Sequence, residues 1–221
     1  SCSYCAVSAS GNYAKFRMRP VEQVLDEIKL QAHSKQVGFI DFEDENLTLK
    51  KSWVLALLDG IRQIFKGQPV ELRAMNGLFP PSLDEEILAA MKAAGFKTLN
   101  LSVGSFSAPQ LKRFKRPDVR DAHDRVLDMA RDLDMDCVSY LPGAAPGQTA
   151  ETTLNDLLTL ATRRTIAGLS IYYPAPGSSD YARCERQKLL PHDFSLMRST
   201  VFPVADTTSR LEAVTLLFLA R

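Results

Sequence analysis

The 221-residue sequence is poor in the features that mark secreted, membrane-spanning or nucleic-acid-binding proteins. Four cysteines are too few for a disulfide-stapled scaffold, and no basic, then apolar leader opens the sequence. No apolar run approaches the ~18 residues that a membrane helix needs. The 27 basic and 26 acidic residues leave a net charge of +1, whereas a nucleic-acid binder usually carries a basic excess. We therefore expect a cytoplasmic protein with neither a membrane nor a nucleic acid as its partner.

The sequence does contain the composition and the periodicity of a folded α/β domain. Hydrophobic residues make up 45% of the chain and charged residues 24%. Helical spacing of apolar residues alternates with short apolar runs of the kind found in buried strands. The pattern predicts helices at residues 19–34, 50–65, 82–95, 118–133 and 149–163, each followed by a strand, at 37–42, 69–75, 98–103, 135–141 and 168–173. Ser82 is expected to be an N-cap, and a further helix is expected from about Thr207. Because parallel strands need helical crossovers, the class is α/β, either an open doubly wound sheet or an incomplete barrel.

The two ends of the sequence suggest a piece of a longer protein. It opens at Ser1 rather than at a methionine, and it stops within a helical pattern at Arg221. We expect residues 1–183 to form the core, without its first strand. Residues 184–221 would form a C-terminal connection and helix that is also cut short.

The most informative motif is Cys2-Ser3-Tyr4-Cys5. A CxxC alone is compatible with half of a zinc site, with a redox pair or with chance, so two alternatives to an enzyme stay open: a zinc or redox module with a structural CxxC, and a non-catalytic α/β domain derived from a barrel. Zinc needs two more ligands, but Cys137, Cys184 and the three histidines lack ligand spacing. A redox pair usually precedes a helix directly, which this one does not. Cys137 is expected to be a small buried residue and Cys184 an incidental loop thiol.

The motif and four further segments resemble the radical S-adenosylmethionine (SAM) superfamily, in the branch often joined to a cobalamin-binding domain. The family signature is CxxxCxxC with an aromatic residue before the third cysteine. Cys2, Tyr4 and Cys5 match the second cysteine, the aromatic residue and the third cysteine, and the first would lie four residues before Cys2. The other similar segments are FRMRP (16–20), FEDEN (42–46), GAAPGQT (143–149) and YPAPGS (173–178). The resemblance implies an incomplete (β/α)6 TIM-like partial barrel of parallel strands.

The resemblance also implies a chemistry and its cofactors. In the family, three cysteines hold a [4Fe-4S] cluster, because thiolates are the soft ligands that such clusters need. The fourth iron has no cysteine ligand and binds SAM. Electron transfer to SAM then yields a 5′-deoxyadenosyl radical, or the site supports radical methyl transfer, on a substrate that is unknown here. The expected partner is an electron donor such as flavodoxin or ferredoxin. The branch of the family also makes cobalamin a candidate cofactor of the full-length protein. The 221-residue chain by itself is expected to be inactive, since it lacks the first cluster cysteine.

The resemblance assigns roles to individual residues. Cys2 and Cys5 are the expected metal ligands, and the cofactor-binding residues expected are Tyr4, Glu43, Asp44, Glu45, Ser102, Ser105 and Gly143. Tyr4 would lie near the adenine, and one carboxylate of the 43–45 tract would receive the ammonium group of SAM. Gly104 stands where the family often has a glutamate, so the contact of that carboxylate is in doubt. The basic run at residues 111–117 is expected to be a solvated loop.

Overall fold

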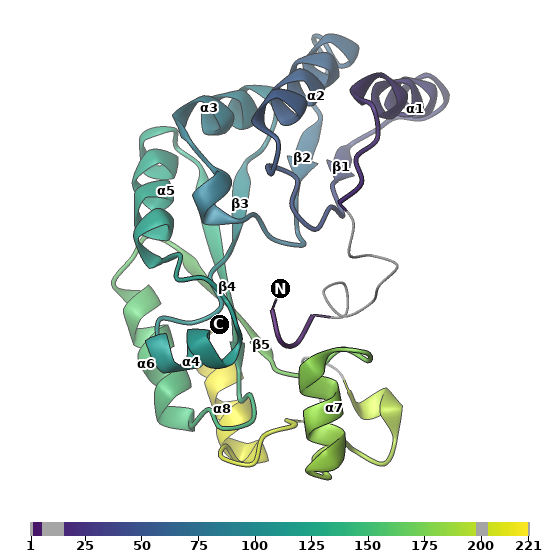
Figure 1. The fold of residues 1–221 in the computed structure, drawn as a ribbon. Helices are drawn as coiled ribbons and strands as arrows, with labels where there is room; N and C mark the ends of the chain where they lie inside the picture. The colour runs from purple at the N-terminus through teal and green to yellow at the C-terminus, as the bar shows by residue number, and fades with distance from the viewer. Residues whose placement is uncertain (1, 6–15, 198–202, 221) are drawn as a thin grey trace. The chain divides into compact units, whose positions relative to one another are not determined.

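The structure is a computed structural model that describes residues 2–5, 16–197 and 203–220 (Figure 1). The chain divides into two compact units. The acidic-tract unit, which contains residues 43–45, comprises Arg17–Ser102 and Val119–Val138. The cysteine unit, which contains Cys2 and Cys5, comprises Ser1–Phe16, Val103–Asp118 and Ser139–Arg221. Each is described by itself below.

The acidic-tract unit alternates helices with parallel strands. Its elements are α1 (Val21–Ser34), β1 (Phe39–Asp41), α2 (Lys51–Ile64), β2 (Glu71–Arg73), the 3₁₀ turn η1 (Pro80–Ser82), α3 (Glu85–Ala94), β3 (Thr98–Ser102) and α5 (Arg120–Asp132). β1 and β2 pair in parallel, with Ile40 opposite Leu72. Isolated parallel bridges, Leu72 to Phe96 and Leu78 to Leu101, continue this arrangement toward β3.

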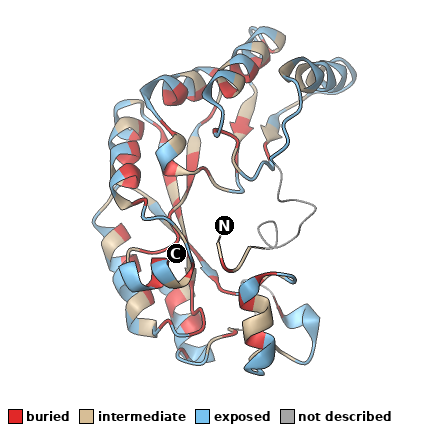
Figure 2. Cartoon of the chain, in the orientation of Figure 1, coloured by how far each residue is buried: buried red, intermediate tan, exposed pale blue. Residues whose placement is uncertain are grey.

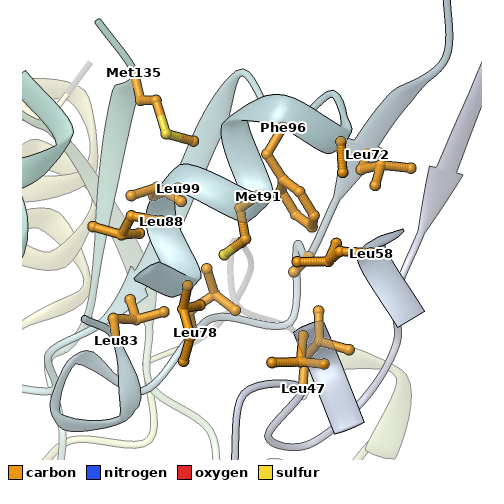
Figure 3. Packing of buried hydrophobic residues seen from close by; sticks show 14 of the residues in the cluster. Leu47, Leu58, Leu72, Leu78, Leu83, Leu88, Met91, Phe96, Leu99 and Met135 are labelled. Atoms are coloured by element: carbon orange, nitrogen blue, oxygen red, sulfur yellow. The ribbon is translucent and has the colours of Figure 1, made fainter. Parts of the chain in front are cut away.

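The core of this unit lies between its helices and strands. Helix α2 contacts α1 and α3, and α3 contacts α5. Figure 2 shows that these helices carry exposed residues along their outer faces. Leu58, Met91 and Phe96 are at most 1% exposed and belong to the cluster drawn in Figure 3. Burying one such large apolar side chain contributes about 1.5–3 kcal/mol, so this cluster is the main stabilising feature of the unit.

The cysteine unit contains the remaining helices and the last two strands. Its elements are α4 (Ala108–Arg113), most of β4 (Asp136–Gly143), α6 (Ala150–Ala161), β5 (Ile166–Ile171), α7 (Ser179–Arg186), the 3₁₀ turn η2 (Phe194–Leu196) and α8 (Arg210–Leu219). Within this unit, β4 is hydrogen-bonded to its neighbour β5. Helix α6 contacts both β5 and α8. The loops that follow the strand ends of this unit position the cysteine motif.

The predicted alternation of helices and strands is confirmed, with boundaries shifted by a few residues. The expected N-cap Ser82 is wrong, because Ser82 lies in η1 and its hydroxyl donates to the Phe79 carbonyl. Asp84 caps α3 instead, since its carboxylate accepts the Ile87 amide at 2.9 Å. Gly95 ends α3 in the left-handed conformation, as its position predicted. The proposed boundary at residues 183 and 184 stays a prediction.

Two segments expected to be irregular are helical in part or in full. The prediction that the basic run is a solvated loop is wrong for residues 111–113, which complete α4, and for Leu111 and Phe114, which are only 3% and 0% exposed, whereas residues 115–117 lie outside any helix. Their spacing of three residues puts both apolar side chains on one helical face. Cys184 is not a loop thiol, since it lies on α7 and is buried. Cys137 is buried on β4, as predicted.

Helix lengths and hydropathy also bear on membrane insertion. Within residues 2–5, 16–197 and 203–220, no helix is both long enough and apolar enough to cross a membrane.

Candidate metal centre at the CxxC turn

Cys2 and Cys5 lie in one tight turn. The Cys5 amide donates to the Cys2 carbonyl at 3.4 Å, which closes the turn. Both thiols are free and partly exposed, whereas Cys137 and Cys184 are buried. The turn therefore offers two accessible sulfur ligands close together in sequence and in space.

The segment after α4 contacts the turn through a backbone hydrogen bond and through aromatic packing. The Ser3 amide donates to the Phe114 carbonyl at 2.8 Å. The Tyr4 ring meets the Phe114 and Tyr172 rings edge-on, with centroids 5.0 and 6.0 Å away. Such edge-to-face pairs contribute about 0.5–1.5 kcal/mol each beyond the area that they bury. The aromatic residue of the motif is thus fixed by packing.

The start of α7 holds the same turn through Ser3. The Ser3 hydroxyl donates to Asp180 Oδ2 at 3.0 Å, and the Asp180 amide donates to the Ser3 carbonyl at 2.9 Å. The Ser179 hydroxyl also donates to that carbonyl, at 3.0 Å. Ser3 is itself only 4% exposed. Ser3, one of the two residues between the cysteines, is therefore held by hydrogen bonds to the start of α7, far along the chain.

Asp180 is the centre of a buried polar network. Besides the Ser3 hydroxyl, it accepts the Tyr172 hydroxyl at 2.6 Å, and the Arg113 guanidinium lies 4.0 Å from the same oxygen. Burial raises the pKa of Tyr172, and its hydrogen bond to the Asp180 carboxylate raises it further. Tyr172 therefore stays a neutral donor across the physiological pH range.

Arg116 brings a positive charge to the cysteine side of the turn. Its Nη1 lies 3.2 Å from the Tyr4 hydroxyl and 3.8 Å from Cys2 Sγ, and its Nε donates to the Val103 carbonyl at 3.1 Å. Burial raises the pKa of Tyr4, and the nearby Arg116 partly opposes that rise. Three separate parts of the cysteine unit, namely α4 with the residues that follow it, the end of β5 and the start of α7, thus converge on four residues of sequence.

The predicted acidic residues lie in the other unit, after β1. Glu43, Asp44 and Glu45 are all exposed. The Asn76 amide donates to the Glu43 carbonyl at 2.9 Å, which ties this tract to the loop after β2. Ser102 is half-buried at the end of β3. These residues occupy carboxyl ends of parallel strands, where α/β sheets bind ligands.

Ser105 and Gly143 have structural explanations within the cysteine unit. Ser105 is fully buried, and its hydroxyl donates to Asp156 Oδ2 at 2.7 Å. The Phe106 amide donates to the other oxygen of Asp156 at 2.8 Å, so this carboxylate closes the loop after β3. A Cβ on Gly143 would lie 2.8 Å from side-chain carbons of Leu169 and of Thr153. Close packing explains this glycine, and cofactor contacts of Ser105 and Gly143 stay predictions.

Sequence reasoning missed the residues that hold the turn. Asp180, Tyr172 and Arg116 carried no prediction of a role at the motif, and Arg116 was only part of the basic run. The available signals were weak. Polar residues follow the PGS segment at 176–178, and an arginine and a phenylalanine interrupt the lysines of the basic run.

The donor set suits a soft metal ion or an iron–sulfur cluster, because two thiolates are present. Among the residues that the structure describes, no group of three or more His, Cys, Asp or Glu side chains could hold a metal ion. The turn therefore contributes two ligands, which fits a partial cluster motif and leaves a four-ligand zinc site without support from the described residues.

Comparison with known proteins decides the family. The family model described as the radical SAM superfamily matches residues 1–160, which is most of the chain. The chain belongs to the radical SAM superfamily. No curated protein sequence matches it significantly.

Solved radical SAM proteins have a similar fold. The methyltransferase TsrM from Kitasatospora setae is 17% identical, with a TM-score of 0.67 over 84% of this chain and 37% of TsrM. Coproporphyrinogen III oxidase (HemN) from Escherichia coli is 19% identical, with a TM-score of 0.61 over 99% of this chain and 49% of HemN. The cobalamin-dependent SAM radical enzyme OxsB is 14% identical, with a TM-score of 0.57 over 99% of this chain and 33% of OxsB. The predicted incomplete (β/α)6 partial barrel is confirmed, and this radical SAM chain spans between a third and a half of these three proteins.

Proposed function

We propose that this chain is the core of a radical SAM enzyme that binds a [4Fe-4S] cluster and SAM. The observation that carries the proposal is the Cys2–Cys5 turn, whose thiols are partly exposed while Ser3 and Tyr4 are held by α7 and by the segment after α4. Support comes from the family match, which covers the turn. When bound, the cluster supplies the electron that cleaves SAM reductively to a 5′-deoxyadenosyl radical.

The protein's own part is to hold and to shield these groups. Cys2 and Cys5 would each ligate one iron, and a third cysteine would come from outside the 221 residues, four positions before Cys2. The Tyr4 ring, packed against Phe114 and Tyr172, would shield one side of the bound groups from water. A carboxylate of Glu43, Asp44 or Glu45 would accept hydrogen bonds from the ammonium group of SAM, and Ser102 would contact its polar groups.

We propose radical methyl transfer with cobalamin as one possible outcome of this chemistry, and two of the similar structures support it. One TsrM structure contains cobalamin and a [4Fe-4S] cluster, and OxsB is described as cobalamin-dependent. We therefore propose that the full-length protein also has a cobalamin-binding domain. These residues do not specify a substrate class. The electron donor would be a flavodoxin or a ferredoxin, and the protein would work in the cytoplasm.

Cysteine substitution in the full-length protein tests the proposal. After anaerobic reconstitution, we expect about four irons per chain and SAM-dependent 5′-deoxyadenosine formation in the wild type. Cys2→Ala and Cys5→Ala should each lose most of the iron and all detectable 5′-deoxyadenosine. Cys137→Ala is the matched control, because it removes one thiol that is buried on β4.

Two outcomes would contradict the proposal. Stoichiometric zinc that resists exchange for iron would favour a structural CxxC. Equal loss of iron from Cys137→Ala and from Cys2→Ala would show that the iron content depends on correct folding and not on Cys2 as an iron ligand.

A further inference from the structure

The Arg116 side chain is hydrogen-bonded to the CxxC turn, so it places a positive charge beside Cys2. Its Nη1 lies 3.8 Å from Cys2 Sγ, within reach of an N–H···S hydrogen bond, and 3.2 Å from the Tyr4 hydroxyl. Its Nε donates to the Val103 carbonyl at 3.1 Å. The contacts to these two oxygens hold the guanidinium in an orientation in which Nη1 also reaches the sulfur.

Gly104 makes the room that this arrangement requires. A Cβ at Gly104 would lie 2.5 Å from Arg116 Cδ and 2.6 Å from Arg116 Nε, which is closer than real side chains approach. Gly104 also has a φ of +92°, a region that disfavours any side chain. The Arg116 side chain thus lies directly against the Gly104 backbone, where no larger residue leaves it room.

A guanidinium at a ligand sulfur affects an iron–sulfur cluster through charge. The reduced cluster carries one more negative charge than the oxidised cluster, and hydrogen bonds to the sulfurs are among the factors that set its reduction potential. A nearby positive charge stabilises the reduced state more than the oxidised state.

We propose that Arg116, accommodated by Gly104, raises the reduction potential of the cluster held by Cys2 and Cys5. The inference rests on the proposed function, since it requires the cluster. The step concerned is a one-electron reduction by an external donor, and Arg116 neither gives nor takes a proton in it. Arg116 is thus a tuning residue, separate from the thiolates that hold the iron.

Redox titration of the reconstituted full-length protein tests this inference. The midpoint potential is followed by electron paramagnetic resonance without SAM, with dithionite as the reductant. Arg116→Gln should favour the oxidised cluster by at least tenfold, which is about 59 mV for a one-electron couple. Lys112→Gln is the matched control, because it removes one exposed positive charge from the same basic run and should leave the potential unchanged.

A second variant separates position from charge. Gly104→Ala keeps every charge but displaces the Arg116 side chain, so its potential should shift in the same direction as that of Arg116→Gln. The iron content of Arg116→Gln should match that of the wild type, since Arg116 supplies no thiolate.

The outcomes distinguish this inference from the proposed function. A normal cluster whose potential is the same in Arg116→Gln as in Lys112→Gln would overturn the tuning role alone. Loss of iron from Arg116→Gln at an unchanged Tm would replace tuning by a structural role. A wild-type protein that holds no [4Fe-4S] cluster would overturn the proposed function and this inference together.

Discussion

At the scale of single residues, the motif depends on side chains that lie far from it in sequence. Ser3 and Asp180 are 177 positions apart, yet they exchange two hydrogen bonds. The Asp180 carboxylate accepts two hydrogen bonds, from the Ser3 and Tyr172 hydroxyls, and Asp180 is only 5% exposed. A buried donor left without an acceptor costs about 1–3 kcal/mol, so this carboxylate matters for the geometry of the cysteines.

Replacing Asp180 tests that dependence. Asp180→Ala leaves the Ser3 and Tyr172 hydroxyls without their acceptor, and we expect the free energy of unfolding to fall by about 1–3 kcal/mol. The turn should also loosen, so Cys2 and Cys5 of the apoprotein should react faster with iodoacetamide. Urea denaturation and mass spectrometry of the alkylated thiols measure the two effects. Glu185→Ala, an exposed acidic residue on the same helix, is the control, and equal alkylation rates in both variants would disprove the role of Asp180.

At the scale of elements, strongly periodic helices were predictable, whereas short ones were not. α2 and α5 each have several apolar residues at helical spacing, which is enough to reveal a buried face. α4 has six residues and α7 has eight, too few for a period to be visible. The start of α7 depends on local capping, because the Ser178 hydroxyl accepts the Tyr181 amide, whereas α4 has no side-chain cap. Both short helices adjoin the segments that hold the CxxC turn, so the site was the part least accessible to pattern reading.

The start of α3 offers a pH-dependent test of capping. The hydrogen bond from Lys51 is the largest cause that lowers the pKa of Asp84, and the Ile87 amide adds to it. A lowered pKa in the folded state means that the charge of Asp84 stabilises the fold above its unfolded pKa of about 4, and that this contribution is lost as the pH falls through the folded pKa. Asp84→Asn keeps an N-cap acceptor but loses the charge, so it should be less stable than the wild type at pH 7 and converge with it as the pH falls below the lowered, folded-state pKa of Asp84.

The matched variant for capping itself is Asp84→Ala. It should be destabilised by about 1 kcal/mol at every pH in this range relative to Asp84→Asn, since the acceptor is lost as well. Urea unfolding at several pH values measures both differences. A gap between the wild type and Asp84→Asn that stays constant down to pH 2 would refute the link to the pKa of Asp84.

At the scale of the whole molecule, each unit carries a different part of the predicted site. The cysteine unit has Cys2, Tyr4 and Cys5, and the acidic-tract unit has Glu43, Asp44, Glu45 and Ser102. The 221 residues offer two accessible cysteines, because Cys137 and Cys184 are buried within their own elements. Cluster binding by three thiolates therefore requires a ligand beyond the residues described.

Reconstitution of the 221-residue chain by itself tests this count of ligands. We expect little or no [4Fe-4S] cluster and no 5′-deoxyadenosine, because only two thiolates are available to a cube that needs three from the protein. Iron and sulfide analysis, with electron paramagnetic resonance of the reduced sample, measures the outcome. A stable four-iron cluster with normal cleavage of SAM would show that two cysteines suffice.

The sequence by itself determined the α/β class, the order of the main elements and the motif that identifies the family. These depend on local spacing, since apolar periodicity, Gly95 and the CxxC pattern all lie within short windows. Only the tertiary structure decided what holds the motif. Asp180, Tyr172 and Arg116 reach the turn because distant segments are folded against it, and no local pattern records such contacts. It also decided that Ser105 closes a loop on Asp156, since a buried hydroxyl takes whichever acceptor the packing supplies.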